Sequence, residues 1–232
     1  LEQKVIDGLK EGIKNGHIIF RGSSHSLSVK QGQAPGDALR TEMASFWAVL
    51  YPKYEKVTTR ISNDQKAILD VLSGNTNLTK DVQDLNLYDK SGHINFQSPL
   101  LDAIRITLVT SQNNGNRILG KNLLEVFCAP PYGWDSNAVR VAIAALVRAG
   151  TVKIISGKKE YTNPSDSELI DSIRVSRNFD KVELVMEDTE IDQLILNEVR
   201  TFLIRMTKKR NIDETPAALS EAGENLANTI LD

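Results

Sequence analysis

Residues 129–161 read APPYGWDSNAVRVAIAALVRAGTVKIISGKKEY, and this stretch predicts a helix followed by a short hairpin. Asp135 is a suitable N-cap, because its carboxylate can accept hydrogen bonds from the free amides of the first helical turn. Gly150 suits the left-handed position that ends many helices. After Gly150, the β-branched residues of 151–155 predict a strand, and a short glycine-containing link returns the chain along 159–162. The order is therefore helix, then wing.

The spacing of residues along this helix predicts two different faces. Val139, Ile143, Leu146 and Val147 recur at helical spacing and form the expected core face. Polar side chains fall along another face of the helix and along the hairpin that follows, where they could contact the major groove and phosphates of duplex DNA. These candidate DNA-binding residues are Asn137, Arg140, Arg148, Lys153, Lys158 and Lys159.

Two further helices are expected before this stretch. Pro99 suits the first turn of a helix over residues 100–110, and residues 118–127 show a second run of helical spacing. Three helices followed by a two-stranded wing is the order of a winged-helix domain, a variant of helix-turn-helix. We place this domain at residues 93–163.

Composition limits what the chain can bind. Its 232 residues are 41% apolar, which is enough for a real core, and the formal net charge is −2. So small a charge gives the whole chain no attraction to nucleic acid. Residues 100–161, however, contain eight basic and four acidic residues. Any contact with DNA would therefore depend on this local patch.

The cysteine count and the lack of long apolar runs predict a cytoplasmic protein. A single cysteine, Cys128, excludes an intrachain disulfide framework and suits a reducing compartment. We expect Cys128 to be packed in the core rather than catalytic. No apolar run approaches the roughly 20 residues that cross a bilayer, so no membrane partner is expected. The chain starts at Leu1 without a methionine, and we expect it to be a piece of a longer polypeptide.

The N-terminal residues 1–92 predict helices and one small hairpin. Residues 1–13 carry one apolar helical stripe, and HIIFRG at 17–22 predicts the hairpin. Asp37 is expected to cap the next helix, which Pro52 should bend or end near Tyr51. The inner face of that helix is expected to comprise Leu39, Met43, Phe46, Trp47 and Leu50.

The rest of this region is turn-rich. Ser62 and Gln65 fit a capping box in front of a short helix that Gly74 closes. Residues 75–97 predict one brief helix, and residues 93–96 are a candidate strand.

The C-terminal residues 164–232 also predict mainly helix. Residues 165–173 form a linker or a short helix, and 182–186 are a short apolar run. A strong helix is expected from Thr189, and Thr215 with Pro216 should begin a last helix. The apolar stripe of the strong helix comprises Ile191, Leu194, Ile195, Val199, Phe202, Leu203 and Met206.

Residues 115–122, GNRILGKN, fit the GxxxxGK part of a phosphate-binding loop. The complete motif needs a Ser or Thr hydroxyl on Mg²⁺ after the lysine, but Asn122 follows Lys121. No apolar strand ending in acidic residues follows to hold the metal. We therefore assign no nucleotide-binding residue, and a nucleotide-binding fragment is kept as an alternative.

Other catalytic and metal-binding patterns are missing from the sequence. His17, His25 and His93 have no cysteine or histidine neighbours at ligand spacing. The Gly-x-Ser-x-Gly and His-Glu-x-x-His motifs do not occur. We expect no catalytic residue, no metal and no cofactor in this chain.

Residues 127–150, FCAPPYGWDSNAVRVAIAALVRAG, resemble a segment of the large P-loop ATPases (BrxC/PglY type) of bacteriophage-exclusion (BREX) defence systems. The resemblance rests on Phe127, the PPYGW turn at 130–134, Asp135 and the helix that ends in Ala-Gly. It implies a bacterial cytoplasmic ATPase that excludes phage DNA together with partner proteins, including a methyltransferase. Because no convincing Walker motif is present here, it carries no ATP-binding residue over to this chain.

We therefore expect a mostly α fold with small β hairpins, of the α+β class, with an embedded winged-helix domain. Our first hypothesis is a non-catalytic region of a larger ATP-binding phage-defence protein that engages proteins or DNA. Its expected partners are the rest of its own polypeptide, other defence-system proteins and, as one alternative, duplex DNA. The other functions we consider are a nucleotide-binding fragment acting through 115–122 and a winged-helix transcriptional regulator.

Overall fold

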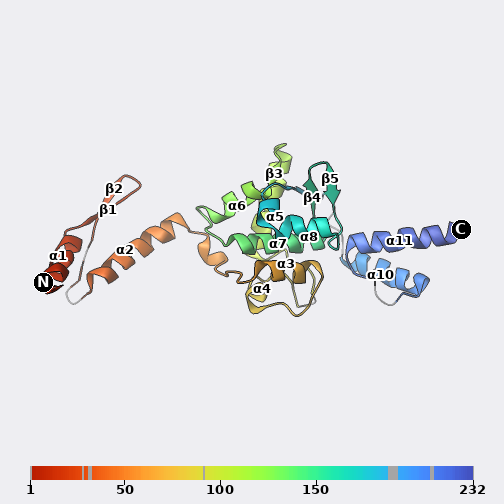
Figure 1. Ribbon diagram of the computed structural model, residues 1–232, viewed down its shortest axis with the longest axis horizontal. Helices are drawn as coiled ribbons and strands as arrows, with labels where there is room; N and C mark the ends of the chain where they lie inside the picture. The colour runs from red at the N-terminus through yellow and green to blue at the C-terminus, as the bar shows by residue number, and fades with distance from the viewer. Residues whose placement is uncertain are drawn as a thin grey trace. The chain divides into compact units, whose positions relative to one another are not determined.

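The computed structural model describes residues 2–27, 29–30, 33–90, 92–187, 193–209 and 212–231. Contacts within the chain divide it into two compact units, Leu1–Lys53 and Tyr54–Asp232. The described residues are mainly helical and include two small antiparallel sheets (Figure 1). This confirms the predicted α+β class.

The first unit contains two helices and a hairpin. Its elements are α1 (Glu2–Lys14), β1 (His17–Phe20), β2 (Ser23–Ser26) and α2 (Pro35–Leu50). The hairpin reverses at Arg21 and Gly22, which both have positive φ, 50° and 81°, as a tight two-residue turn requires. Phe20 stacks on Phe46 of α2 with ring centroids 4.6 Å apart. The predicted order of helix, hairpin and helix is confirmed.

Two predictions about α2 are wrong. The N-cap is Ala34 rather than Asp37, because Pro35 starts the helix three residues earlier with its fixed φ and missing N–H. Met43 and Trp47 were expected in the core, but they are 58% and 51% exposed. Within its own unit, α2 does not have enough neighbours to cover its whole apolar stripe.

The second unit holds the remaining elements. Before the Pro-Pro turn these are η1 (Tyr54–Lys56), α3 (Asp64–Leu72), α4 (Lys80–Asp84), α5 (Pro99–Asn113), β3 (Ile118–Leu119) and α6 (Gly120–Cys128). After the turn they are α7 (Ser136–Arg148), β4 (Val152–Ser156), β5 (Lys159–Tyr161), α8 (Ser167–Arg174), α9 (Ser176–Phe179), β6 (Glu183–Met186), α10 (Gln193–Thr207) and α11 (Pro216–Leu231).

Helix α7 forms the centre of this unit. The Asp135 side chain caps it by accepting from the amide of Asn137, and Gly150 follows it with φ 72°, so both predicted ends are confirmed. Residues Ala138 to Val147 are all buried. Helices α3, α5, α6 and α8 and strand β4 all pack on α7 (Figure 1). The prediction of one core face and one open face is therefore wrong, because α3 and α8 cover the side expected to be open.

The wing is part of a four-stranded antiparallel sheet with the order β3-β6-β4-β5. The predicted hairpin is present: Ile154 pairs with Tyr161, and Gly157 takes φ 65° in the turn. On its other edge, β4 pairs with β6, and β6 in turn pairs with β3. The sequence analysis recognised β6 only as an apolar run.

Three smaller predictions need correction. Asn63, not Ser62, caps α3 by accepting from the amide of Lys66. The Ser62 hydroxyl instead donates to Asp81. The expected helix over 118–127 begins at Gly120, after the short strand β3. The candidate strand at 93–96 contributes only an isolated bridge, between Tyr88 and Ile94.

The last two helices form a hairpin with its own small core. Leu196 and Leu203 of α10 pack with Ile212 and with Leu219 of α11. The predicted helix start at Thr189 lies outside the described residues. The three predicted domain ranges stay predictions, because contacts divide the chain only once, after Lys53. No helix within the described ranges is long and apolar enough to span a membrane.

Candidate functional site

An aromatic cluster fixes the turn that leads into α7. Phe127 and Trp134 are stacked with an interplanar angle of 2° and centroids 5.3 Å apart. Tyr132 meets both rings edge-on, at 4.8 and 4.6 Å. The amide of Trp134 donates to the carbonyl of Phe127 at 2.8 Å, and Trp134 is only 3% exposed. These aromatic residues therefore anchor the turn in the core.

Asp135 links this turn to another part of the unit. Besides capping α7, its Oδ2 accepts a 2.8 Å hydrogen bond from the amide of Ile61. The neighbouring Cys128 is exposed, so its predicted burial is wrong. Although the residue is exposed, neighbouring atoms still shield its thiol in part, and this partial loss of solvent is the larger cause of a raised pKa for Cys128. The negative charge of the nearby Asp135 carboxylate is the smaller cause. A raised pKa leaves less of the reactive thiolate, which does not suit a nucleophile.

Arg140 is the most constrained of the candidate DNA-binding residues. Its guanidinium donates to Oδ2 of Asp64 at 2.8 Å and, through Nε and Nη2, to the carbonyl of Ile173 at 3.1 and 2.7 Å. Nη2 also donates to the carbonyl of Arg174, and the guanidinium lies 5.9 Å from the ring centre of Phe179. Only 3% of Arg140 is exposed. Arg140 therefore connects α3, α7 and the end of α8 from inside the unit.

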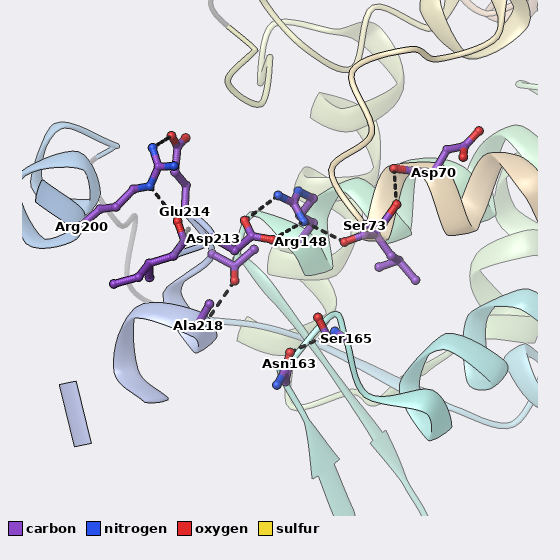
Figure 2. A network of polar contacts seen from close by, with 12 residues as sticks. Asp70, Ser73, Arg148, Asn163, Ser165, Arg200, Asp213, Glu214 and Ala218 are labelled. Carbon is purple, nitrogen blue, oxygen red and sulfur yellow. Dashed lines mark hydrogen bonds and ion pairs between the residues drawn. The ribbon is translucent and has the colours of Figure 1, made fainter. Parts of the chain in front are cut away.

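Arg148 makes a second set of internal contacts at the other end of α7. Its Nη1 donates to the carbonyl of Leu72 at 2.8 Å, and its Nη2 donates to Oδ1 of Asp213 at 2.7 Å (Figure 2). Gly74 makes room for this side chain, since a Cβ there would lie 2.3 Å from Nη2 of Arg148. Arg148 thus joins the end of α3 to the segment before α11.

A cavity of about 630 Å³ lies beside Arg148 and is also lined by Tyr88, Arg200 and Glu214. Arg200 donates to the carbonyl of Ile212 at 2.8 Å and pairs with Glu214 at 2.5 Å (Figure 2). Both arginines of the cavity are thus already bonded to carboxylates. Burial raises the pKa of Tyr88 to about 12, so its hydroxyl stays protonated at neutral pH.

Two of the three candidate lysines on the wing, Lys153 and Lys159, form ion pairs with carboxylates. Lys153 lies 3.2 Å from Glu160 and 3.1 Å from Glu187, and hydrogen bonds to these carboxylates raise its pKa. Lys159 donates to Glu168 at 2.9 Å, which likewise raises its pKa. Lys158, at the turn of the wing, is exposed. The last candidate, Asn137, is partly buried at the start of α7. Its Oδ1 accepts a 3.5 Å hydrogen bond from Nη1 of Arg140.

In the segment 115–122, which resembles a phosphate-binding loop, two backbone amides are already hydrogen-bonded to carbonyls of the chain. The amide of Gly120 donates to the carbonyl of Val182 at 2.9 Å, and that of Lys121 donates to Asp180 at 3.3 Å. A phosphate-binding loop would use such amides to hold phosphate oxygens. A Cβ at Gly120 would lie 2.0 Å from the carbonyl oxygen of Phe179, so this glycine serves close backbone packing.

The structure separates the six predicted DNA-binding residues instead of gathering them on one surface. Two are engaged inside the unit, Asn137 lies partly buried next to one of them, and the lysines lie on the wing. The sequence analysis missed Asp64, Asp213 and Glu168, whose carboxylates bind these cations. Their partners are up to 76 residues away in the sequence, so local spacing gave no signal. Among the described residues, no group of three metal-ligating side chains comes together.

Comparison with known proteins identifies a match to one family. The family model described as the BREX ATP-binding protein BrxC winged helix-turn-helix domain matches residues 55–190, more than half of the chain. The matched range includes α3, which packs on α7, and β6, which lies between β3 and β4 in the sheet. Neither a curated protein nor a solved structure gave a significant match.

Proposed function

Since the chain belongs to the BREX ATP-binding protein BrxC winged helix-turn-helix domain family, we propose that it is a non-catalytic docking region of a larger phage-defence protein. In this proposal the winged helix binds protein partners, and α7 serves as its central scaffold. The partners are the rest of its own polypeptide and other proteins of the defence system. The expected location is the bacterial cytoplasm.

The observation that carries the proposal is the burial of Arg140. In helix-turn-helix proteins that read DNA, side chains of the recognition helix reach base edges in the major groove. The corresponding helix here is α7, and Arg140 is 3% exposed and bonded to Asp64 and to backbone carbonyls. Entry of α7 into a groove would require α3 and α8 to leave it. That would expose a core helix and leave a buried charge without partners, which is costly.

A second candidate function, duplex DNA contact through the wing alone, is favoured by one observation. Lys158 is exposed at the turn between β4 and β5. Lys153 and Lys159 beside it are held by carboxylates, which reduces the positive potential that a phosphate would meet. A single free lysine supports weak contact that does not depend on DNA sequence.

Nucleotide binding through 115–122 is not part of the proposal. The amides of Gly120 and Lys121 are engaged with carbonyls, and Lys121 lies 3.7 Å from Glu125. The position after the lysine offers an amide side chain rather than the hydroxyl that Mg²⁺ needs. An independent transcriptional regulator is likewise less well supported, because it too would need an open recognition helix.

A salt-titrated DNA-binding assay tests the proposal. Fluorescence anisotropy with a labelled duplex would be recorded for the wild type, Lys158→Ala and the matched surface control Lys181→Ala. If the domain binds proteins and α7 does not enter the DNA groove, DNA binding should be weak. The slope of the logarithm of the binding constant against the logarithm of the salt concentration should then be no steeper than about −2, which corresponds to roughly two phosphate contacts. A Lys158→Ala slope shallower by about one unit would favour the second candidate.

The proposal would be contradicted by tight binding with a steep salt slope. A slope near −5 or beyond would mean that five or more phosphates are neutralised, which the wing cannot provide alone. Strong preference for one duplex sequence over another would have the same consequence, because it requires contacts to base edges.

A further inference from the structure

Helix α10 carries an apolar stripe that its own hairpin does not cover. Ile195, Val199, Phe202 and Met206 are 56%, 39%, 56% and 50% exposed. Their spacing of four, three and four residues places them along one line of the helix, as in the seam of a coiled coil. Single exposed apolar residues are common on proteins, but four in line on one helix form a surface suited to another helix.

The side of α10 next to this stripe is already occupied. Leu196 and Leu203 are 6% and 4% exposed and pack with α11. In heptad terms the stripe fills the core positions, and these two leucines flank it on one side. The exposed stripe is therefore additional to what the α10–α11 hairpin needs for its own core.

The other flank of the stripe carries one charge of each sign. Glu198 and Arg205 are seven residues apart and both exposed. Together with Asn197, Thr201 and Phe202, they line a shallow groove on this face. They occupy equivalent flanking positions of successive heptads, where charges select the partner and the orientation of paired helices.

This pattern is complementary to itself when two copies of the helix run antiparallel. When the twofold axis passes between Val199 and Phe202, Val199 of each copy packs against Phe202 of the other copy. Ile195 then meets Met206 of the second copy, and Glu198 lies beside Arg205 of the second copy. By symmetry, both charge pairs form at once. A parallel pair would instead set Glu198 against Leu203, which α11 already covers.

We propose that the exposed face of α10 binds the same face of a second copy of this chain in an antiparallel, twofold arrangement. The apolar stripe supplies the association energy, and the Glu198–Arg205 pairs set the orientation. Four half-exposed side chains per copy make a small interface, so the dissociation constant is expected on the order of 10 µM. This inference uses no residue of the winged helix and does not depend on the proposed docking function.

Sedimentation velocity of the full 232-residue chain over a concentration series tests the inference. The wild type should shift from monomer to dimer as its concentration rises. Phe202→Ser should weaken association at least tenfold, whereas Ile106→Ser, at a 54% exposed apolar position on α5, should leave it unchanged. All of these side chains are exposed, and circular dichroism with thermal unfolding would check that each variant keeps its fold.

Charge reversal gives a sharper test of the antiparallel geometry. Glu198→Arg alone places arginine against arginine across the seam, and Arg205→Glu alone places glutamate against glutamate. Each variant should therefore associate severalfold more weakly by itself. An equimolar mixture of the two restores both opposite-charge pairs and should dimerise at least as well as the wild type.

Two outcomes would overturn the inference. One is a wild-type chain that stays monomeric up to its solubility limit. The other is a dimer that tolerates Phe202→Ser, or whose single charge variants do not recover on mixing. In the second case the copies associate through a different surface.

Discussion

The guanidinium of Arg140 donates a 2.8 Å hydrogen bond to the carboxylate of Asp64, and Arg140 itself is only 3% exposed. This pair joins the start of α3 to the middle of α7. The remaining donors of Arg140 reach the carbonyls of Ile173 and Arg174 at the end of α8. A side chain that the sequence suggested for DNA thus connects three helices of the core.

The first prediction concerns the stability that depends on Arg140. Arg140→Met keeps the apolar stem but leaves Asp64 and the carbonyl of Ile173 without their donor. We expect the free energy of unfolding to fall by about 3 kcal/mol, in the range measured when one partner of a buried ion pair is removed. Asp64→Asn should cost less, because Asp64 is 29% exposed. Urea unfolding followed by circular dichroism measures both, and equal stability of wild type and Arg140→Met would refute an internal role.

The second prediction isolates the contact between Gly74 and Arg148. Gly74 has φ 69°, and a Cβ there would lie 2.3 Å from Nη2 of Arg148. Gly92 is a matched control, because it has φ 84° and nothing within 4 Å of its would-be Cβ. Gly92→Ala should cost about 1 kcal/mol for the backbone conformation alone. Gly74→Ala should cost roughly 1–2 kcal/mol more, since Arg148 must also leave the carbonyl of Leu72.

Chemical denaturation of the two alanine variants tests this difference. A double variant with Arg148→Ala provides a further control. If Arg148 is the obstacle, Gly74→Ala should add no more destabilisation to Arg148→Ala than Gly92→Ala does. Equal costs for the two glycine substitutions in the wild-type background would show that Arg148 does not occupy this place.

The third prediction concerns pH and Asp81. Hydrogen bonds from the Thr79 hydroxyl and from Ser62 lower the pKa of Asp81 from 3.8 to about 2. Because the pKa is lower in the folded protein, ionised Asp81 stabilises the fold above about pH 4. This contribution is lost as the pH falls toward 2. At pH 7, Asp81→Asn should cost roughly 1–2 kcal/mol, reduced from the full shift by solvent screening.

Unfolding free energies of Asp81→Asn and wild type at pH 7 and at pH 3 check this sign. The difference between them should shrink at the lower pH. Asp84→Asn, on the same helix and exposed, is the control and should show little effect at either pH. A cost for Asp81→Asn that is the same at both pH values would contradict the assigned hydrogen bonds.

The sequence predicted best those features that depend on a few neighbouring residues. The cap at Asp135, the left-handed Gly150 and the glycine turn of the wing follow from local chemistry, and all are present. The resemblance of residues 127–150 also indicated the correct family. In these places one residue type is strongly preferred for a physical reason, so a single sequence is sufficient.

Features that depend on distant partners could not be predicted in this way. Helical spacing placed Arg140 on an open face because nothing near it in sequence indicates that α3 and α8 cover it. Strand β6 joins the sheet between β3 and β4, and its pairing with Ile118 is set by the fold of the whole unit. Asn63 and Ser62 are both good caps, and the contact of Ser62 with Asp81 explains why Asn63 takes the position.

Hydrogen exchange of the α7 amides, with and without duplex DNA, tests most directly whether this helix is an internal scaffold. The account predicts that residues 138–147 exchange only with global unfolding, so that DNA at low salt changes their protection no more than that of the other slowest amides of the unit. It would be contradicted by rapid exchange in α7, or by a rise in protection on adding DNA that is confined to α7.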